Sequence, residues 1–560
     1  MLRGRLPDNV SEYPKPVRGV NLRKSVEDLL PEESELESNC FYDSGLRTRF
    51  GRARFTTVSL GMNYGLGATK AYFADGSTAR VVAFDTNLVE ISDAGAISTI
   101  TSTLSSGRDT HFRQWSVTDR LYLCNRANSL MALDSAGAFA SVTGSYIPQS
   151  PTMAVPYLDR LCVLQGNVVV ITDSYTDSVF SPTTSSWAAF RGIGGSGNPT
   201  AIALHSATGT PGDPQAQLLI FQANTTTALV GSDLGSNVTA ASPPTGFDGQ
   251  LILLDPRIGT SSPYSVCNVP GVGTFWFTTN RNVVWLPIGQ SIPRMIGNSL
   301  YSYRSGILGL NDVSQTNLGQ VVMEYHDLKL KLYLPVNGQT YSTIQYWLDL
   351  RPVMENLAAV LTAPEGFPAN WSGPHTGQAV RRVWTENQGN DNDLLMGIEG
   401  DPTNGLMVYE QNPVNYYRDD VGVSTSSEIY YRWESFYNPM GAPGYQKHLY
   451  DLWLDVEGYI NLATVSVSDI HATLTDGFSI LRSDGSAFSN ITYGNGFRYG
   501  NGTLYGQGAQ NNLGHVNFTS RGTVVPYGDA LKISVHCQQG HFAVNRVLPH
   551  AKIQRVLPVT

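Results

Sequence analysis

Three residues near the C-terminus have side chains that commonly bind metal ions. His536 and Cys537 are adjacent, and His541 follows after a Gln-Gln-Gly segment that could turn a hairpin and bring the two histidines together. Adjacent residues of a strand point to opposite faces of a sheet, however, so His536 and Cys537 do not share a face. A structural zinc site takes four ligands, and we find no further ligands for this one. We therefore predict that these side chains pack or face solvent, and that the chain holds no metal ion or other cofactor.

Acidic residues raise a second possible chemistry, the hydrolysis of glycosidic bonds. The turns 92–95 (Ser-Asp-Ala-Gly) and 134–137 (Asp-Ser-Ala-Gly) resemble fragments of the Asp box of sialidase-type propellers, but the Thr-Trp of that box is absent. Asp and Gly are also typical of ordinary hairpin turns. Adjacent acids, as at 32–33 and 419–420, do not show that two carboxylates lie about 5–10 Å apart in a cleft, which a glycosidase requires. The sequence contains no P-loop, His-Glu-x-x-His, Gly-x-Ser-x-Gly or EF-hand motif. We therefore predict that the chain is not an enzyme.

A cluster of basic residues could bind the phosphates of nucleic acid. The cluster consists of Arg47, Arg49, Arg52 and Arg54. Further basic residues precede it: Arg3, Arg5, Lys15, Arg18, Arg23 and Lys24. One interpretation is a surface that faces DNA, because phosphates attract such a stripe. The interpretation that we favour is that alternate arginines on a strand form salt bridges within or between subunits, because nothing else in the chain resembles a nucleic-acid-binding module.

The composition describes a globular protein. The chain has 560 residues, of which 41% are hydrophobic and 15% charged, and its net charge is −9. An acidic balance argues against a protein that coats nucleic acid through a broad basic surface. The five cysteines form no Cys-x-x-Cys pair, so we expect reduced cysteines that pack in cores. The N-terminus has no apolar signal-peptide region, and no apolar run approaches the ~20 residues of a membrane span, so we expect no membrane insertion.

A loose repeat covers residues 70–424. Arg80, Arg120 and Arg160 each begin an apolar segment, and they are spaced forty residues apart. This spacing matches the ~40–45 residues of a four-stranded propeller blade. Less regular copies of this pattern begin near residues 217, 274, 328 and 394. Together with the regular ones they predict six or seven irregular blades with inserted loops. A closed ring stacks each sheet on its neighbours and leaves only short edges. The alternative is a stack of β-sandwiches, which predicts less regular spacing.

The regions on either side of the repeat differ from it in their sequence patterns. Residues 1–69 contain several prolines and a hairpin pattern around 43–45 (Asp-Ser-Gly), which predicts an extended arm and a hairpin. Residues 425–560 contain long strand-like segments, as at 449–456 and 531–537, together with Asp-Gly and Asn-Gly turns. We predict a C-terminal β-sandwich for this region. The predicted fold class is therefore all-β, with a β-propeller and a C-terminal β-sandwich.

Part of the chain resembles a known protein family. The segments that carry the resemblance are Gly19-Val20-Asn21-Leu22-Arg23, Leu30-Pro31-Glu32-Glu33, Asn39, and Asp43-Ser44-Gly45-Leu46-Arg47-Thr48-Arg49-Phe50-Gly51. They are similar to the N-terminal signature of tail nozzle proteins, which are the tail tubular protein B-like or DNA-stabilisation proteins of short-tailed bacteriophages. Arg23 is followed by Lys-Ser-Val, where many of these proteins have an Asp-Pro-like turn. Segments 159–187 and 218–231 are similar to their propeller blades.

The resemblance implies a structural virion protein without catalytic residues. Several copies, which we expect to be a homohexamer, form a ring-shaped nozzle below the portal and the head-to-tail adaptor protein, and a tail fibre or tail-tip protein is a further partner. The nozzle retains packaged DNA and conducts the double-stranded DNA on ejection without recognising its sequence. The expected localisation is the phage tail, after assembly in the host cytoplasm. A net charge of −9 fits a passage that repels DNA lightly.

Two other functions are compatible with a propeller sequence. The first is a carbohydrate-binding or sialidase-like propeller that acts at the tail tip on host glycans. The second is a propeller scaffold in a cellular complex. Loss of glycan binding when one pocket is mutated, with no effect on particle assembly, would favour the first of these over the nozzle.

Overall fold

The structure is a computed structural model, and it shows a nearly all-β chain. It describes residues 9–554 apart from the segments 11–12, 44, 62–63, 185–196, 207–215, 236, 240–247, 363–366, 368, 388–392, 412, 414–417, 441–445, 470–477, 480, 483–496, 500–502, 506–510, 518–526 and 529. Among the residues described, none of the helices combines the length and the hydropathy of a membrane span.

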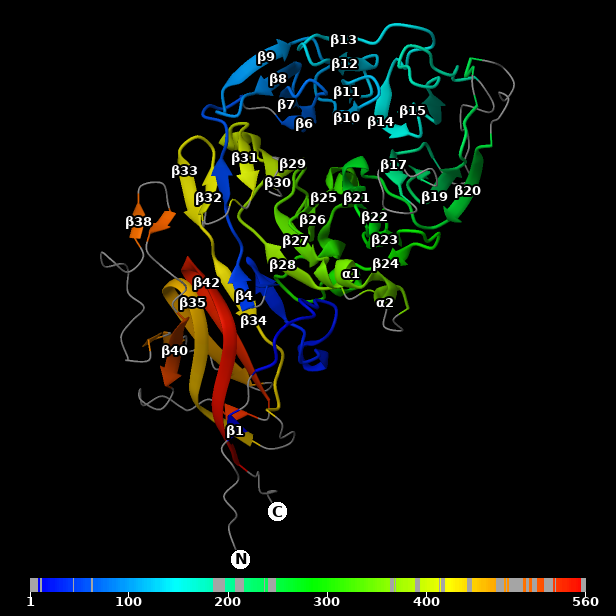
Figure 1. Cartoon of the computed structure of the whole chain (residues 1–560). Coiled ribbons are helices and arrows are strands. Elements are labelled where there is room, and N and C mark those ends of the chain that lie inside the picture. The colour runs from blue at the N-terminus through cyan, green and yellow to red at the C-terminus, as the bar shows by residue number, and fades with distance from the viewer. Residues whose placement is uncertain are drawn as a thin grey trace, which may run out of the picture.

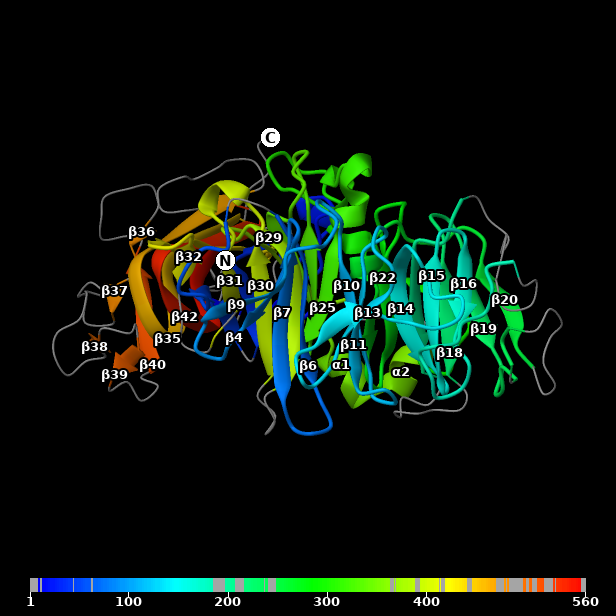
Figure 2. The same cartoon turned by 90° about the horizontal axis from the view of Figure 1, so that it is seen from above.

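Seven sheets form a ring, so the central part of the chain is a β-propeller. Five of the described sheets have four strands, one has three and one has six. Figure 1 views the ring along its axis, and Figure 2 shows the same ring from its side. Six or seven blades were predicted, and the structure has seven.

The blades follow one another in chain order. Blade 1 consists of β6 (Gly65–Tyr72), β7 (Thr78–Phe84), β8 (Asn87–Ile91) and β9 (Ile97–Thr101). Blade 2 consists of β10 (His111–Trp115), β11 (Arg120–Cys124), β12 (Met131–Leu133) and β13 (Phe139–Ser141). Blade 3 consists of β14 (Pro151–Tyr157), β15 (Arg160–Gln165) and β16 (Val168–Ile171). Blade 4 consists of β17 (Ala201–His205), β18 (Gln217–Phe221), β19 (Thr226–Val230) and β20 (Gln250–Asp255). Blade 5 consists of β21 (Cys267–Val269), β22 (Gly273–Phe277), β23 (Val283–Pro287) and β24 (Arg294–Met295). Blade 6 consists of β25 (Val322–His326), β26 (Lys329–Leu334), β27 (Ile344–Asp349) and β28 (Trp371–His375). Blade 7 consists, in the order of pairing, of β29 (Val380–Asn387), β30 (Asp393–Glu399), β31 (Val408–Gln411), β5 (Arg52–Arg54), β32 (Arg418–Val421) and β33 (Thr425–Glu428).

Helices are short and lie in the connections. The α-helices are α1 (Arg351–Glu355) and α2 (Leu357–Thr362). The 3-10 helices are η1 (Val26–Asp28), η2 (Pro263–Ser265), η3 (Asn298–Leu300), η4 (Leu310–Asp312), η5 (Gln315–Gln320) and η6 (Pro402–Asn404).

The forty-residue repeat places the same strand of three blades in register. Arg80 lies in β7, and Arg120 and Arg160 begin β11 and β15, so all three arginines lie on the second strand of their blades. Alternate residues of a strand face opposite sides of a sheet. In β7, Val81 packs towards blade 2, whereas Val82 packs towards blade 7. Each blade therefore buries both faces, and only a closed ring covers all of them.

The ring closes between its first and last blades. The innermost strand β29 of blade 7 contacts β6 of blade 1. The strand β5 comes from the N-terminal region and pairs antiparallel with β31 and parallel with β32. Its insertion supplies the hydrogen-bonding partner that the edge of β31 would otherwise lack.

The C-terminal region forms a second β-domain around one core. Its longest strands, β35 (Gln446–Asp469) and β42 (Leu531–Gln554), pair antiparallel along their lengths. The described strands that complete this eleven-stranded sheet are β1 (Asn9–Val10), β2 (Leu36–Ser38), β3 (Cys40–Asp43), β4 (Gly45–Thr48), β34 (Tyr431–Glu434), β36 (Phe478–Ser479), β37 (Leu481–Arg482), β40 (Asn511–Asn517) and β41 (Tyr527–Gly528). A separate hairpin consists of β38 (Phe497–Tyr499) and β39 (Thr503–Tyr505).

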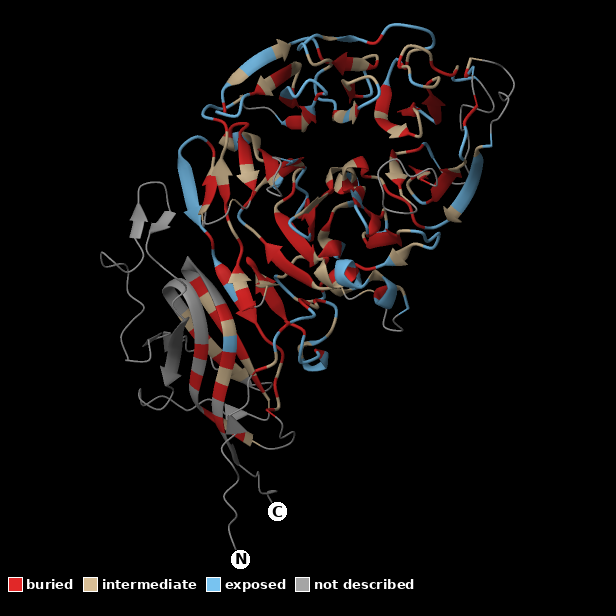
Figure 3. Cartoon of the chain, viewed as in Figure 1, coloured by how far each residue is buried: buried red, intermediate tan, exposed pale blue. Residues whose placement is uncertain are grey.

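The N-terminal region is not a separate arm, contrary to the division predicted at residue 69. Its strands β1 and β4 pair with β42, and β2 pairs with β34. Its strand β5 belongs to blade 7, and blade 1 begins at Gly65 rather than at residue 70. Strands need partners on their edges, and these partners lie hundreds of residues away, where sequence periodicity gives no signal. Figure 3 shows buried residues continuing from the blades into β34 and β42.

Candidate functional site

A cavity of about 1050 Å³ lies where the segment that begins at Arg18 crosses blades 5 and 6. Its wall comes from this N-terminal segment, from β24 and η3, and from α2 and the residues before β28. The described lining residues are Arg18, Val20, Asn21, Arg23, Lys24, Glu33, Arg294, Met295, Ile296, Asn298, Ser299, Ala359, Val360, Phe367, Ala369 and Asn370. Four of them, Val20, Asn21, Arg23 and Glu33, belong to the N-terminal signature, so part of the signature lines the cavity.

Glycine at position 19 allows the N-terminal segment to lie directly on blade 6. Gly19 has a φ of +67°, and a Cβ atom there would lie 2.2 Å from the carbonyl oxygen of Trp371. The next residue, Val20, donates its backbone N–H to that same oxygen at 2.7 Å. Only glycine combines this conformation with so close an approach. Val20 and Leu22 are then fully buried in the core between blades 5 and 6.

Asparagine at position 21 shapes the turn that points basic side chains into the cavity. Its Oδ1 accepts hydrogen bonds from the backbone N–H groups of Arg23 and Lys24, which is a local Asx-type turn. Its Nδ2 donates to Oε1 of Glu33 at 2.9 Å. Lys24 donates to the same carboxylate at 3.0 Å. Glu33 therefore fixes one side of the cavity wall.

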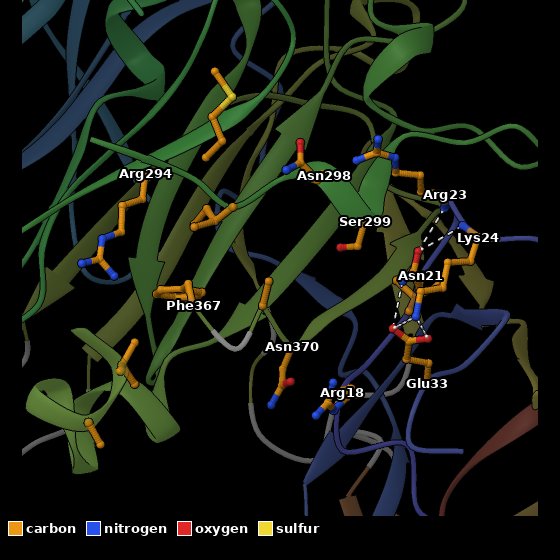
Figure 4. Close-up of a pocket in the computed structure, with 16 residues that line it drawn as sticks. Arg18, Asn21, Arg23, Lys24, Glu33, Arg294, Asn298, Ser299, Phe367 and Asn370 are labelled. Carbon is orange, nitrogen blue, oxygen red and sulfur yellow. Dashed lines mark hydrogen bonds and ion pairs between the residues drawn. The ribbon is translucent and has the colours of Figure 1, made fainter. Parts of the chain in front are cut away.

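Positive charge dominates the cavity wall. Four of the lining side chains are cations, and Glu33 is the one carboxylate among the described lining residues. Figure 4 shows Arg294 on the opposite side of the cavity from Arg23 and Lys24. Arg18 also pairs with Glu32 outside the lining, at 3.2 Å. A cleft lined by one sign of charge raises the local concentration of the opposite charge, so this cavity suits an anionic group.

The floor between the cations is apolar. Val20 and Ile296 are buried, and Val360 and Phe367 line the same space. Arg294 lies with its guanidinium 5.9 Å from the centre of the Trp285 ring and donates to the carbonyl of Leu361 at 3.2 Å. A ligand that fits this surface needs apolar groups in its middle and negative charge at its ends.

The predicted basic cluster lies elsewhere, at the closure of the ring. Arg49 is buried, forms a two-pronged ion pair with Asp419, and donates its Nε to Oδ1 of Asn39 at 2.8 Å. Arg47 donates its Nε to the carbonyl of Asp43 at 3.1 Å. The ion pair of Arg49 lies within one chain.

The other two arginines of the cluster bind blade 7. Arg52 is buried, its Nη2 lies 3.0 Å from Oε2 of Glu399, and its guanidinium lies 4.2 Å from the centre of the Tyr409 ring. Arg54 is partly exposed and pairs with Asp420 at 3.7 Å. The acidic pair at 419–420 thus supplies counter-ions to Arg49 and Arg54.

Of the candidate metal ligands, His536 and Cys537 can be placed, and these two do not share a site. Cys537 is buried in the core of the C-terminal domain, and His536 lies 3.4 Å from the hydroxyl of Tyr430. The side chain of His541 lies outside the described residues. Within the described part of the chain, no three His, Cys, Asp or Glu side chains are placed to hold a metal ion.

The two Asp-box-like turns carry ordinary turn and ion-pair contacts. Lys70 and Arg80 lie within ion-pair distance of Asp93, and Lys70 lowers the pKa of this carboxyl. Asp134 accepts hydrogen bonds from backbone N–H groups of its own turn, from Ala136 and Ala138.

A polar cluster at the centre of the ring was not predicted. Tyr264, in η2, donates its hydroxyl to the carbonyls of Leu66 and Thr110, at 3.3 and 3.1 Å. His111 stacks on the Tyr264 ring at 4.1 Å, and the Arg382 guanidinium lies 3.6 Å from the centre of that ring. These residues come from blades 1, 2 and 7 and from the connection before blade 5, so Tyr264 spans the middle of the ring.

Electrostatics keep this central cluster in one charge state. Burial, with the nearby Arg382, lowers the pKa of His111 to about 3. Burial raises the pKa of Asp109, but Arg382 and Arg381 outweigh it and hold that pKa below its usual value. Arg382 lies 2.6 Å from Asp109. The one sequence signal was the adjacent pair Arg381-Arg382, which stands among apolar residues in the segment Val-Arg-Arg-Val-Trp at the start of β29.

Comparisons with known proteins add little to this description. No family model and no curated protein matches the chain. The chain is similar to solved structures of a streptogramin B lyase (9% identity, TM-score 0.39, 65% of this chain and 98% of that chain). It is also similar to BBS1N in complex with ARL6DN (10%, 0.39, 66% and 98%) and to YCF48 from Cyanidioschyzon merolae (7%, 0.35, 65% and 99%). At these values the similarities carry no argument about function, and the fold rests on the strand pairing of the chain itself.

Proposed function

We propose that this chain is a structural subunit of the tail nozzle of a short-tailed bacteriophage. Copies of it form a ring, in our proposal a homohexamer, that retains packaged double-stranded DNA and conducts it on ejection. One observation carries the proposal: the residues that resemble the nozzle signature hold the two β-domains together, which is the role of a rigid structural subunit.

Asn39 and Arg49 make the first part of this junction. Asn39 has a φ of +56° and donates its Nδ2 to the carbonyl of Tyr430, beside the C-terminal sheet. Its Oδ1 accepts from Arg49 Nε and from the backbone N–H of Thr376, at the end of blade 6. Arg49 in turn pairs with Asp419 of blade 7. Two signature residues therefore connect three sheets.

Glycines make the second part of the junction. A Cβ atom at Gly51 would lie 1.8 Å from the carbonyl oxygen of Arg418, so only glycine lets the chain pass β32 into β5. Gly19 permits the contact with Trp371 that was described above. Gly51 lies between Arg49 and Arg52, whose ion pairs with Asp419 and Glu399 are buried, and these contacts hold the chain where it passes from one domain to the other.

A rigid junction suits a conduit better than a catalyst. A ring subunit must keep its interfaces in register while DNA moves past it, so its domains must not pivot. A net charge of −9 favours sliding over gripping, since cations that bind phosphates retain DNA. The proposed partners are further copies of the chain, the head-to-tail adaptor and a tail fibre or tail-tip protein, with the phage tail as the location.

Co-assembly with the adaptor tests the proposal. The chain is mixed with purified adaptor rings, and the mass of the complex is measured by light scattering and its symmetry by cryo-electron microscopy. We expect a closed ring of this chain on the adaptor. A chain that stays monomeric in the presence of adaptor and portal rings contradicts the proposal. Turnover of a fluorogenic glycoside, or specific binding on a glycan array, would instead favour a carbohydrate-active propeller.

A further inference from the structure

The outermost strand of blade 4 exposes apolar side chains at an unpaired edge. β20 pairs with β19 on one side, and no described strand pairs with its other side. Leu251, Ile252 and Leu253 are 42%, 44% and 50% exposed. Figure 3 shows this strand in pale blue at the rim of the ring. Soluble proteins normally protect such edges with charge or a covering segment, so β20 has the character of an interface.

The other outermost strands that Figure 3 shows as exposed are more polar. β33 has the sequence Thr-Ser-Ser-Glu, and all four residues are exposed. In β9 the exposed residues are Ser98 and Thr99, whereas Ile97 and Ile100 are half-buried. Exposed aliphatic residues in an uninterrupted run therefore distinguish β20 from these two strands.

Acidic residues lie at both ends of this apolar strand. Asp248 precedes β20, and Asp255 is its last residue. Asp248 accepts hydrogen bonds from the hydroxyl of Ser232 at 2.7 Å and from the backbone N–H of Asp233 at 2.8 Å. The segment 248–255 is therefore an extended ridge with an apolar middle and a negative charge at each end.

The basic cavity has the complementary arrangement. Arg294 lies on one side of it and Arg23 and Lys24 on the other, with Phe367 and Val20 between them. Its border strand β24 is the outermost strand of blade 5, and Met295 on that strand is 50% exposed. Cations at the two ends and apolar groups in the middle match the ridge in both charge and hydropathy.

We propose that the segment 248–255 of one copy docks in the basic cavity of a second copy. Pairing with β19 holds β20 in its own blade, so it cannot fold back into the cavity of its own chain. The two surfaces differ, so the contact is head-to-tail, and its repetition gives a closed ring or a filament. The inference rests on the proposed function, because it names the surfaces through which copies of a nozzle subunit would assemble.

Charge reversal on the two surfaces tests this contact. The ridge variant carries Asp248→Lys and Asp255→Lys, and the cavity variant carries Arg23→Glu and Arg294→Glu. Alone, each variant places like charges against each other, so we expect at least a tenfold loss of self-association, measured by light scattering with adaptor rings present. In a mixture in which the two variants alternate, the basic ridge of one meets the acidic cavity of the other, and the remaining ridges and cavities keep their wild-type charges. Every contact then joins opposite charges, so we expect assembly to recover. Arg108→Glu, a reversal at an exposed position in the connection between blades 1 and 2, is the control and should assemble like the wild type.

Crosslinking gives a second readout that does not depend on charge. All five native cysteines are buried, so Ile252→Cys on the ridge and Met295→Cys at the cavity supply the only accessible thiols among the residues described. We expect a bismaleimide to join the copies into ladders when both thiols are present, and not when either is alone. The contact is overturned if both charge variants assemble normally, or if assembled rings of the chain that carries both introduced cysteines give no such ladder.

The two proposals fail in different ways. Assembly on the adaptor that is unaffected by either charge variant would overturn this contact and leave the nozzle function standing. Crosslinked ladders from a chain that never joins an adaptor would establish the contact and overturn the nozzle function.

Discussion

At the scale of single residues, arginines close the propeller ring. Arg52 and its partner Glu399 are both almost completely buried, with side-chain exposures of 1% and 0%. The Arg52 guanidinium also donates to the carbonyls of Asp420 and Ala379, at 2.7 and 2.9 Å. Its three nitrogen atoms therefore donate to three different segments, at Asp420, Ala379 and Glu399, and hold them relative to β5.

Removal of one partner leaves the other charge buried and uncompensated. We expect Arg52→Ala to lower the free energy of unfolding by about 3–5 kcal/mol, the range for a broken buried ion pair. Urea unfolding, followed by tryptophan fluorescence, measures the change. Arg108→Ala, at an exposed arginine, is the matched control, and an equal midpoint for both variants would contradict the structural role of Arg52.

A buried carboxyl in the C-terminal sheet makes stability depend on pH. Burial raises the pKa of Glu37 to about 8, although the Ser34 hydroxyl acts in the opposite direction. The unfolded chain loses this proton near its ordinary pKa of 4.5, so the folded chain holds one more proton between pH 4.5 and 8. The contribution of Glu37 to the free energy of unfolding is therefore fully present below pH 4.5 and is lost as the pH rises towards 8.

Glutamine at this position should remove that dependence. We expect Glu37→Gln to be more stable than the wild type at pH 8 and to melt at a higher temperature. The difference in the free energy of unfolding should shrink by roughly 1 kcal/mol per pH unit as the pH falls towards 5. Thermal melts across this range measure it. Glu27→Gln, at an exposed glutamate, should show no such trend, and a constant difference between Glu37→Gln and the wild type would contradict the prediction.

The residue types were easier to predict than their partners. The sequence marked Arg47, Arg49, Arg52 and Arg54 as unusual and favoured salt bridges within or between subunits. Arg49, Arg52 and Arg54 have ion pairs within the chain, and Arg47 donates to the carbonyl of Asp43. The sequence could not identify the partners, because Asp419 lies 370 positions after Arg49. The basic cavity was missed as a site, since its cations come from segments that meet only after the ring has closed.

At the scale of elements, sheets that repeat locally were predictable and strands that pair at long range were not. The forty-residue spacing marked the second strands of blades 1 to 3 because each blade is one local meander. β5, in contrast, is three residues long and reads Arg-Ala-Arg. Such a strand has no apolar alternation, so its place in blade 7 follows only from the edge that it covers.

A glycine next to β5 tests this closure. In Gly51→Ala the new Cβ atom would clash with the backbone of Arg418, so β5 must shift away from blade 7. We expect a loss of about 1–3 kcal/mol, as for other overpacked positions, and faster proteolysis around β5 and β32 in blade 7. Limited trypsin digestion with mass spectrometry measures the cleavage.

The control for this variant is another glycine with room around it. A Cβ atom at Gly319 would meet its nearest neighbour at an ordinary distance of 3.6 Å, so Gly319→Ala should digest like the wild type. Equal digestion of Gly51→Ala and Gly319→Ala would show that β5 does not hold the ring closed.

At the scale of the whole molecule, the propeller is a closed disc with a plugged centre. Tyr264, Arg382 and Asp109 interlock across the innermost strands. A DNA passage in the proposed nozzle would therefore run between copies of the chain and not through the propeller. The ring could be predicted from the repeat, but the plug could not, because it forms from a short 3-10 helix that crosses the ring from an inserted loop.

Removal of the tyrosine opens the plug. We expect Tyr264→Ala to destabilise the propeller by less than the ~3–5 kcal/mol of a fully buried aromatic truncation, because Tyr264 is partly buried. The variant loses the stack on His111 and the contact with Arg382. Water that enters the space would relieve the burial of His111, so the pKa of His111 should rise from about 3 towards 6.5. Histidine titration by NMR, assigned with His111→Gln, measures this shift.

A tyrosine outside the plug separates the local effect from a general one. Tyr303 is 77% exposed, so Tyr303→Ala should change neither stability nor the pKa of His111. In tails assembled from Tyr264→Ala subunits, the rate of DNA ejection should equal that of the wild type, because the proposed path bypasses the ring centre. Faster ejection from the opened propeller would place the DNA path through its channel, and a wild-type His111 that titrates near pH 6 would contradict the plug itself.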